Sequence, residues 1–155
     1  MNLLNYLKKE SRIEERHNTI HHYYYNSGIM QDIIKKLKFK DSGIVYNAPA
    51  SIELLFKKLG FKTNFDKKTK SSNTLIFINN NKEYLNFLTT GLKNIEPDSV
   101  LWFAYPKGTS KIKTDINRDT IRVTGEEFGI TTVTAISIDD TWSALRFRPI
   151  DKVGK

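Results

Sequence analysis

The hydrophobic pattern changes period at Gly43, and this change constrains the fold more than any other feature of the 155-residue chain. After Gly43, short apolar runs alternate with longer stretches of helical spacing, which is typical of a sheet whose strands are joined by crossover helices. We predict strands at residues 44–47, 61–65, 75–79, 100–105, 132–138 and 143–148. We predict the intervening helices at residues 51–59, 82–93 and 115–128.

Residues with capping and turn chemistry set the expected limits of these elements. Ser51 and Asn81 are suited to begin helices, whereas Gly60 and Gly129 are suited to end them. Residues 66–73, which read DKKTKSSN, contain no apolar side chain and are predicted to form a loop.

The order of these elements predicts an α/β fold with a mostly parallel, Rossmann-like sheet. Crossover helices make the first five strands mostly parallel, whereas Asp139-Asp140-Thr141 is short enough only for a hairpin and makes the last strand antiparallel. Ligands of such sheets bind beyond the carboxyl ends of the strands. The expected carboxyl ends lie at residues 47–51, 66, 79–81, 105–110 and 139–141.

One or two helices are expected before the sheet. Spaced apolar residues predict a helix over residues 3–22, and a second amphipathic helix is indicated by apolar residues at positions 29, 30, 33, 34 and 37. The chain length suits one domain. We therefore interpret residues 1–28 as a helical extension and residues 29–155 as a single α/β domain.

Composition limits the kinds of site and the cell compartment that we expect for this protein. The sequence has no cysteine, which excludes disulfides, thiolate metal sites and cysteine nucleophiles. Its hydrophobic fraction of 39% is that of a globular protein, and no apolar run approaches the roughly 18 residues that span a bilayer. The N-terminal leucines are too few for the apolar core of a signal peptide. We expect a cytoplasmic protein with no membrane partner.

The chain is basic, with 25 Lys and Arg against 17 Asp and Glu and a formal net charge of +8. Of the basic residues 19 are Lys and 6 are Arg. Because Arg is the residue that binds phosphates and bases bidentately, an excess of Lys is weak evidence for nucleic-acid recognition. The charge is also local, since residues 107–122 hold five basic and two acidic side chains, a net +3.

The order of elements and two stretches of sequence resemble known families. The order, which ends in an antiparallel hairpin after the last crossover helix, resembles the class I S-adenosylmethionine-dependent methyltransferase fold without its third strand and neighbouring helices. Residues 100–119 and 138–149 look like a family of small bacterial proteins of unknown function, grouped as DUF-type domains, with an aromatic-Pro-Lys loop and an Asp-x-Trp-Ser-x-x-Arg ending. Residues 45–55, including Asn47-Ala48-Pro49, are similar to that family's first strand and turn. This resemblance covers residues 30–153 and implies no established reaction.

The loop after the fourth predicted strand is a candidate anion site. It combines Lys107, Lys111 and Lys113 with two hydroxyl groups and the start of a helix, all of which attract anions. It lacks the glycine and lysine spacing of a Walker loop. The alternative is a solvated loop in which Thr114 or Asp115 simply caps the helix and Arg118 or Arg122 pairs with nearby carboxylates.

The final hairpin allows a structural and a functional interpretation. Period-2 alternation places Trp142, Ala144 and Arg146 on one face. In the structural interpretation, which we favour, Asp139 or Asp140 caps the turn. Trp142 then covers the sheet edge, and Arg146 pairs with an acid. In the functional interpretation, Trp142 and Arg146 flank the crevice as a stacking surface and an anion clamp.

Methyl transfer is a second hypothesis. A methyltransferase needs a glycine-rich turn after its first strand, whereas residues 47–51 contain no glycine and include Pro49, which lacks an amide donor. The resemblance implies an acid on the ribose hydroxyls where Asp66 falls. It also implies a polar substrate-orienting motif where Asn79 begins an Asn-Asn-Asn run.

The N-terminal segment offers two weaker hypotheses. His17, His21 and His22 have a spacing that brings two imidazoles onto one helical face for a metal, although an exposed helix end explains them equally well. Residues 23–25 are tyrosines that offer stacking surfaces for nucleic acid beside basic helices. A hydrophobic seam between the extension and the core is the alternative.

Together these patterns favour a binding or regulatory module on a degenerate methyltransferase-like scaffold, with an anionic small molecule or protein partner and no resident cofactor or metal. The alternatives are a small S-adenosylmethionine-dependent methyltransferase and a nucleic-acid-binding protein. The candidate ligand-binding residues are Asn47, Pro49, Asp66, Asn79, Lys107, Ser110, Lys111, Lys113, Arg118, Asp139, Trp142 and Arg146.

Overall fold

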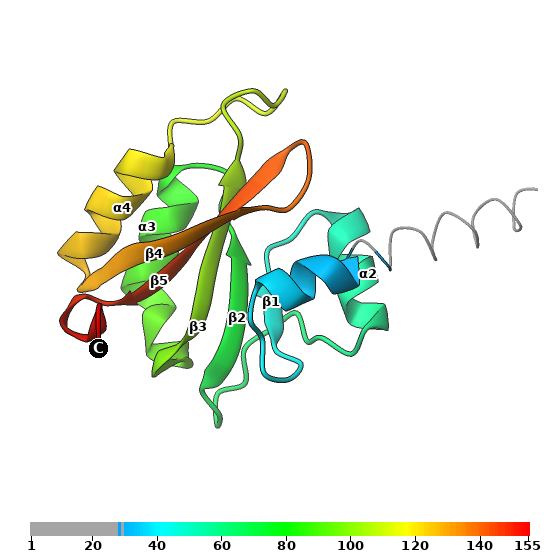
Figure 1. Ribbon diagram of the computed structural model, residues 1–155, viewed down its shortest axis with the longest axis horizontal. Coiled ribbons are helices and arrows are strands. Elements are labelled where there is room, and N and C mark those ends of the chain that lie inside the picture. Colours follow the sequence, from blue (N-terminus) through cyan, green and yellow to red (C-terminus); the bar gives the residue numbers. More distant parts are fainter. Residues whose placement is uncertain (1–27, 29) are drawn as a thin grey trace, which may run out of the picture.

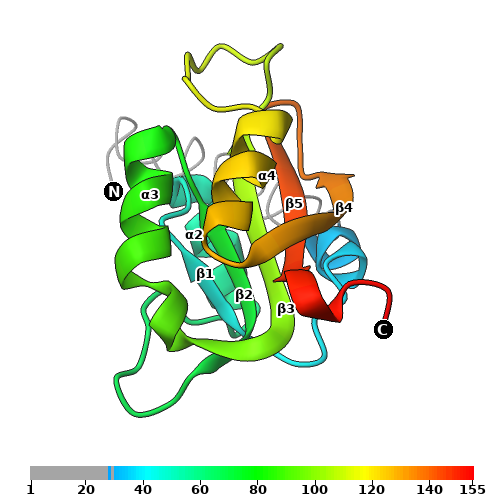
Figure 2. The same cartoon turned by 90° about the vertical axis from the view of Figure 1, so that its left-hand side faces the viewer.

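One sheet organises the part of the chain that the structure, a computed structural model, describes, namely residue 28 and residues 30–155. Helices cover both faces of this sheet (Figures 1 and 2). A helix over residues 30–36 comes first. The elements that follow are β1 (Ile44–Tyr46), α2 (Ala50–Lys58), β2 (Ser71–Phe77), α3 (Asn81–Thr90), β3 (Ile95–Pro106), α4 (Arg118–Glu127), β4 (Ile130–Ser137) and β5 (Trp142–Pro149).

The strand order is β1-β2-β3-β5-β4. β1, β2 and β3 run parallel, and β5 runs antiparallel to both β3 and β4. The predicted α/β fold with a C-terminal antiparallel hairpin is therefore confirmed. The expected helix over residues 3–22, the histidines and the tyrosine run lie outside the described residues.

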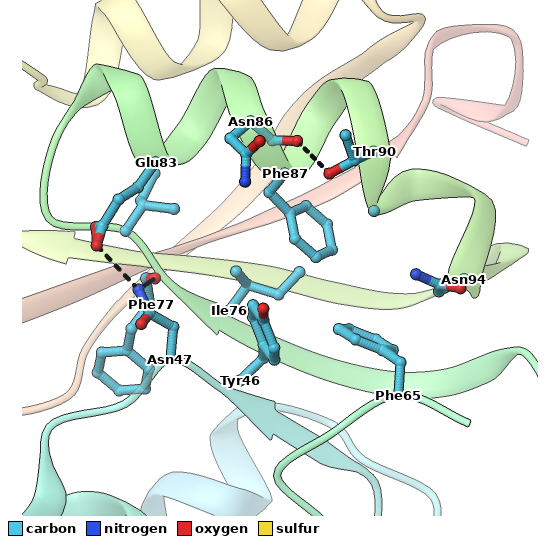
Figure 3. A pocket seen from close by; sticks show the side chains of 12 residues that line it. Tyr46, Asn47, Phe65, Ile76, Phe77, Glu83, Asn86, Phe87, Thr90 and Asn94 are labelled. Atoms are coloured by element: carbon cyan, nitrogen blue, oxygen red, sulfur yellow. Dashed lines mark hydrogen bonds between the residues drawn. The ribbon is translucent and has the colours of Figure 1, made fainter. Parts of the chain in front are cut away.

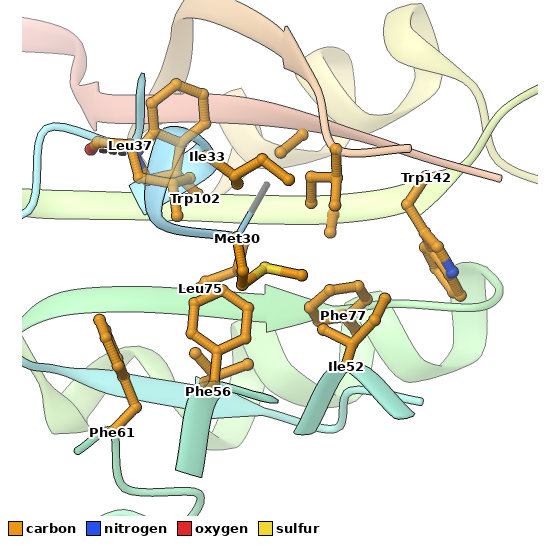
Figure 4. Packing of buried hydrophobic residues seen from close by; sticks show 14 of the residues in the cluster. Met30, Ile33, Leu37, Ile52, Phe56, Phe61, Leu75, Phe77, Trp102 and Trp142 are labelled. Atoms are coloured by element: carbon orange, nitrogen blue, oxygen red, sulfur yellow. Dashed lines mark hydrogen bonds between the residues drawn. The ribbon is translucent and has the colours of Figure 1, made fainter. Parts of the chain in front are cut away.

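The middle strands carry continuous apolar runs because both of their faces are buried. In β2, Leu75 and Phe77 pack with the residues of α2, whereas Ile76 packs with those of α3. On the α2 face, the Trp102 Nε1–H donates a hydrogen bond of 2.9 Å to the Leu37 carbonyl oxygen (Figure 4). This bond fastens the end of the first described helix to the centre of the sheet.

The opposite face is built from aromatic side chains and one close helix approach. Tyr84 and Phe103 meet edge to face at 5.1 Å between ring centroids, as do Phe103 and Phe147 at 5.3 Å. The Tyr84 hydroxyl donates to the Ile121 carbonyl oxygen of α4 at 2.7 Å. A Cβ at Gly125 would lie only 2.7 Å from the Phe147 ring, so glycine is what lets α4 pack this closely.

The edge of the sheet at β4 is more open. On the face away from α4, Thr134 is exposed and its cross-strand partner Arg146 is half-buried. Val133 is 38% exposed at an irregularity in the register between Thr132 and Thr134. In the described part of the chain, this outer region is thus covered by a helix on one face only.

The predicted strand at residues 61–65 is wrong. Only Lys62 pairs with β1, through a parallel bridge to Ile44. Phe61 is buried on the α2 face, whereas Phe65 packs against the aromatic rings of the α3 face. Because residues four apart in a regular strand share one face, this segment instead wraps around the edge of β1.

Several predicted limits also shift. β2 begins at Ser71, inside the predicted loop 66–73, where the hydroxyl groups of Ser71 and Thr74 hydrogen bond at 2.7 Å. The N-caps are Pro49 and Asn80 rather than Ser51 and Asn81. The stops at Gly60 and Gly129 are confirmed, with φ values of 93° and 86°.

Candidate functional site

The chain changes direction across the sheet at β1. Ile44 pairs with Lys62 on its outer side and with Thr74 of β2 on its inner side. Consistent with this reversal, α2 and α3 contribute to the hydrophobic clusters on opposite faces. In open α/β sheets, ligands bind in the crevice at the carboxyl ends of the strands on either side of such a reversal. The candidate site therefore begins at the ends of β1 and β2.

Side chains bridge this crevice. Asn47, which follows β1, has a left-handed φ of 61°. Its Nδ2 donates to the Phe77 carbonyl oxygen at 2.9 Å and to Glu83 Oε1 at 3.2 Å (Figure 3). The backbone N–H of Asn79 donates to Glu83 Oε2 at 2.6 Å. The ends of β1 and β2 and the first turn of α3 are thereby joined into one hydrogen-bonded network.

Glu83 is the member of this network that we did not predict from the sequence. Its backbone N–H donates to Asn80 Oδ1 at 2.9 Å, while its carboxylate reaches back to Asn79. The sequence signal was available, because Asn followed three residues later by Glu is the pattern of a helix N-terminal capping box. Because we predicted the N-cap at Asn81 rather than Asn80, Glu83 did not fall three residues after the predicted cap.

A cavity of about 310 Å³ continues from this network along α3. Tyr46, Phe65 and Phe87 form its aromatic surface, with ring centroids 5.2 to 6.1 Å apart (Figure 3). A Cβ at Gly91 would lie 2.5 Å from the Phe87 ring, so glycine is required for this ring to keep its place. Asn86 lines the same cavity. The surface suits a small planar or apolar group, and it carries no basic side chain.

The basic loop, defined here as residues 107–117, lies beside the crevice. Lys107 anchors its start, with the backbone N–H donating to the Thr141 carbonyl oxygen and Nζ donating to Ser137 Oγ, each at 2.7 Å. Lys111 and Lys113 are exposed. The Ser110 hydroxyl oxygen is buried and has no hydrogen-bond partner in the described part of the chain.

The far end of the basic loop is tied to β2 and α3. The Thr114 hydroxyl donates to the Asn79 carbonyl oxygen at 2.7 Å, and Asp115 Oδ1 accepts from the Asn81 N–H at 2.8 Å. In the alternative interpretation of the loop, the cap at Thr114 or Asp115 is wrong, whereas the pairing of Arg122 with a carboxylate, Glu126, is confirmed. Asn117 caps α4, in a reciprocal capping box with Thr120. Thr114 and Asp115 instead hold the loop across the end of β2.

Hydroxyl groups and cations gather at the base of the loop. Burial raises the pKa of the Tyr105 hydroxyl, whereas the Arg118 charge and a side-chain hydrogen bond with Ser143 lower it. Ser143 is the register partner of both Tyr105 and Ser137. Tyr105, Ser143 and Arg118 therefore lie on the same side of the sheet as the contact between Lys107 and Ser137.

The hairpin follows the structural interpretation at its turn. Asp139 Oδ1 accepts hydrogen bonds from the backbone N–H groups of Thr141 and Trp142 at 2.8 and 2.7 Å. Trp142 is 4% exposed and packs edge to face on Phe77 at 5.0 Å between ring centroids. Its ring belongs to the core, so it does not offer a stacking surface in the crevice.

Three further predicted residues lie elsewhere or serve the backbone. Pro49 is the N-cap of α2, and its carbonyl oxygen accepts from the Glu53 N–H. Asp66 was expected at a carboxyl end, but it lines a hollow with Ser71, at the start of β2. The cause is the missing strand at residues 61–65. Arg146 is also away from the crevice, in a hollow near the starts of β3 and β4, and the expected pairing of Arg146 with an acid is wrong, since no described residue forms an ion pair with it.

The structure thus brings Asn47 and Asn79 together through Glu83. The basic loop lies beside them, and Arg118 lies at its base. The predicted residues of this loop are Lys107, Ser110, Lys111 and Lys113. Whether these residues bind a ligand stays a prediction. Within residues 28 and 30–155, no three His, Asp or Glu side chains come close enough to hold a metal ion. No helix in this described part is both long and apolar enough to cross a membrane.

Comparison with protein-family models found no match, and a search of curated proteins likewise found no similar sequence. The resemblance to a DUF-type family and to methyltransferases therefore remains an expectation from the sequence.

Proposed function

We propose that this protein is a binding or regulatory module that holds an anionic ligand or partner at the basic loop. The observation that carries the proposal is a set of cations without carboxylates. Lys107, Lys111, Lys113 and Arg118 take part in none of the ion pairs of the described residues. The nearby Asp115 accepts from the Asn81 N–H instead. The loop therefore keeps an excess of positive charge directed to solvent.

The chemistry of the loop favours phosphate or carboxylate groups. Exposed lysines act as point charges whose attraction is screened by salt, so affinity depends on several acting together. The hydroxyl groups of Ser110 and Tyr105 add hydrogen-bond donors at the loop and at its base. The buried Ser110 oxygen has no partner among residues 28 and 30–155, and a group of this kind is one that a ligand or water satisfies.

Binding without turnover fits the crevice better than methyl transfer does. The strand order and the terminal hairpin support a methyltransferase-like scaffold, but the bond from Asn47 to the Phe77 carbonyl closes the gap between β1 and β2. Such enzymes bring a glycine-rich backbone close to their cofactor at this turn. Here the turn carries the Asn47 side chain and then Pro49, which has no N–H to donate.

Titration with pyrophosphate, followed by amide chemical shifts, tests the proposal. We expect shifts centred on residues 107–118. The double change Lys111→Glu and Lys113→Glu should weaken binding at least tenfold. The control is Lys68→Glu with Lys70→Glu, which alters net charge equally in another exposed loop with the same spacing. Equal weakening in both variants would mean that only net charge matters and would overturn the site. A hexaglutamate peptide in a parallel titration tests a protein partner.

Thermal shift with S-adenosylmethionine separates the enzyme alternative. We expect no stabilisation of the wild-type protein, because Asn47 occupies the approach to the turn. A saturable increase in melting temperature that disappears when Ala48 is replaced by a bulky residue would favour the methyltransferase instead.

A further inference from the structure

Arg146 occupies an unusual place for a cation, on the open face of the outer sheet. Its register partners are Trp102 on β3, which is fully buried, and Thr134 on β4, which is exposed. Paired residues of antiparallel strands share a face, so Arg146 lies between the buried core and solvent. The guanidinium group therefore sits where the helix layer ends.

Among the described residues, the Arg146 guanidinium has no hydrogen-bond acceptor. Its Nε atom is buried without a hydrogen-bond partner, and no described residue forms an ion pair with it. The next arginine on the same face is satisfied, since Arg148 donates from Nε and Nη2 to the two oxygens of Asp98 at 2.9 and 3.1 Å. Burying a charged donor without an acceptor is unfavourable, so an unpartnered group of this kind calls for an explanation.

The surroundings of Arg146 are electropositive and partly apolar. A hollow of about 570 Å³ is lined by both arginines, Asp98, Thr132, Val133, Val153 and Gly154. Asp98 is the only carboxylate among the described residues that line it. The hydrogen bond from Arg148, together with the charges of Arg148, Lys152 and Arg146, lowers the pKa of that group. Asp98 is already bound side-on by Arg148. Val133 and Val153 are 38% and 43% exposed.

We propose that Arg146 is the anchor of a second site, which binds a small organic oxyanion carried on an apolar body. An oxyanion approaching side-on would repeat the geometry of Asp98 on Arg148 and would supply the acceptor that Nε lacks. The two valines offer apolar surface. The site is distinct from the basic loop, because it lies near the starts of β3 and β4 rather than at their carboxyl ends.

Titration of the full chain with acetate, butyrate and hexanoate, together with inorganic phosphate, tests this site by amide chemical shifts. We expect each anion to shift the amides of residues 132–134 and 146–148. Affinity should rise along the carboxylate series by about three- to fourfold for each methylene that becomes buried against the valines. Absence of shifts in these segments with every anion overturns the proposal. Shifts with phosphate but a flat carboxylate series overturn the apolar part.

Arg146→Met keeps the length of the side chain and removes the donor fork. We expect it to abolish the shifts at residues 132–134, and we expect the melting temperature in anion-free buffer to be no lower than that of the wild type. The matched control is Arg122→Met on α4, where a half-buried arginine pairs with Glu126, and it should leave the titration unchanged.

A structural role for Arg146 predicts different results. If Arg146→Met unfolds the protein or lowers its melting temperature, the guanidinium serves packing and the proposal fails. Arg146→Lys is a second test, because it keeps the positive charge but removes the paired N–H donors of the guanidinium. We expect this variant to fold and to bind the anions at least tenfold more weakly. Unchanged affinity in this variant would also overturn the site. Pyrophosphate shifts at residues 107–118 should persist in all Arg146 variants, so failure of this site and failure of the basic loop are distinguishable.

Discussion

The inner half of the sheet, β1 to β3, is covered by helices on both faces, whereas the outer region at β4 is covered on one face in the described part of the chain. The inner half contains the continuous apolar runs 75–78 and 100–105, whereas β4 has the mostly polar sequence TTVTAIS after Ile130. The contrast teaches that burial on both faces, rather than the number of strand neighbours, sets the composition of a strand. The open face of the outer region also explains why Arg146 on β5 can remain without an ion-pair partner among the described residues.

The largest expected loss of stability comes from comparing one core side chain with one outer side chain. Phe77 is fully buried against Trp142, so Phe77→Ala should lower the free energy of unfolding by about 3–5 kcal/mol. Val133→Ala, at the open irregularity of β4, should change it by about 0.5 kcal/mol or less. Urea denaturation measures both. Similar losses from the two changes would mean that the outer region is packed as tightly as the core.

The link between the two regions is the next test. The Tyr84 hydroxyl on α3 holds the Ile121 carbonyl of α4, and α4 is the helix that covers the outer strands. Tyr84→Phe should lower the free energy of unfolding by about 1 kcal/mol. Hydrogen exchange should quicken in α4 and β4 more than in β1 and β2. Uniform quickening would indicate that the sheet opens as one unit.

The same hydroxyl makes a pH prediction. Burial raises the pKa of Tyr84 far above its ordinary value of 10.0. Its contribution to stability is fully present below that ordinary value and is lost as the pH rises towards the folded pKa. Wild-type melting temperature should therefore fall more steeply above pH 10 than that of Tyr84→Phe. Parallel curves would show that the hydroxyl ionises freely in the folded protein.

Two substitutions of Asn47, which follows β1, separate the effect of backbone strain on stability from the effect of hydrogen bonding. Both Asn47→Gly and Asn47→Ala remove the bonds to Phe77 and Glu83, but only glycine accepts a φ of 61° without strain. Asn47→Ala should therefore be less stable than Asn47→Gly by about 1 kcal/mol. Chemical denaturation of the pair measures this difference. Equal stabilities would place the residue in an ordinary conformation.

The smallest expected effect lies on the outer half, at the ion pair of Asp98 and Arg148. The hydrogen bond and charge of Arg148 lower the pKa of the Asp98 carboxyl from its ordinary value of 3.8. A lowered pKa stabilises the folded state above that ordinary value, and the contribution is lost as the pH falls through the folded pKa. The melting temperature of wild type should exceed that of Asp98→Asn at neutral pH, and the gap should close below pH 3.8. A gap that persists in acid would point to packing instead.

Much of the fold was predictable from the sequence because its signals are local. Five of the six predicted strands and all three crossover helices correspond to elements of the structure. Left-handed stops at Gly60 and Gly129 followed from the special conformational freedom of glycine. The hairpin followed from the three residues available at 139–141. In each case the deciding interaction spans only a few positions along the chain.

The errors arose where long-range contacts decide. Residues 61–65 have a strand-like composition, but Phe61 and Phe65 are drawn to opposite faces of β1. Ser71 joins β2 because β3 lies beside it, at Ile95. In the candidate site, Asn47 and Asn79 were expected. Glu83 was not, because the cap of α3 was placed at Asn81 rather than Asn80, and only its bond to Asn47 is long-range. Arg146 was expected at the crevice but lies away from it. Its position depends on which part of β5 extends beyond the helices, and this is decided by tertiary packing.

The irregularity at Thr132 and Thr134 has a consequence for how copies of the protein meet. In the described part of the chain, β4 is the last strand on its side of the sheet, so its outer backbone groups face no further strand. An unpaired edge of regular register is a template on which a strand from another molecule can dock. The extra residue at Val133 breaks that template midway, because an incoming strand would need the same irregularity to pair along its whole length. We therefore expect the β4 edge to be a poor template for a strand from another molecule.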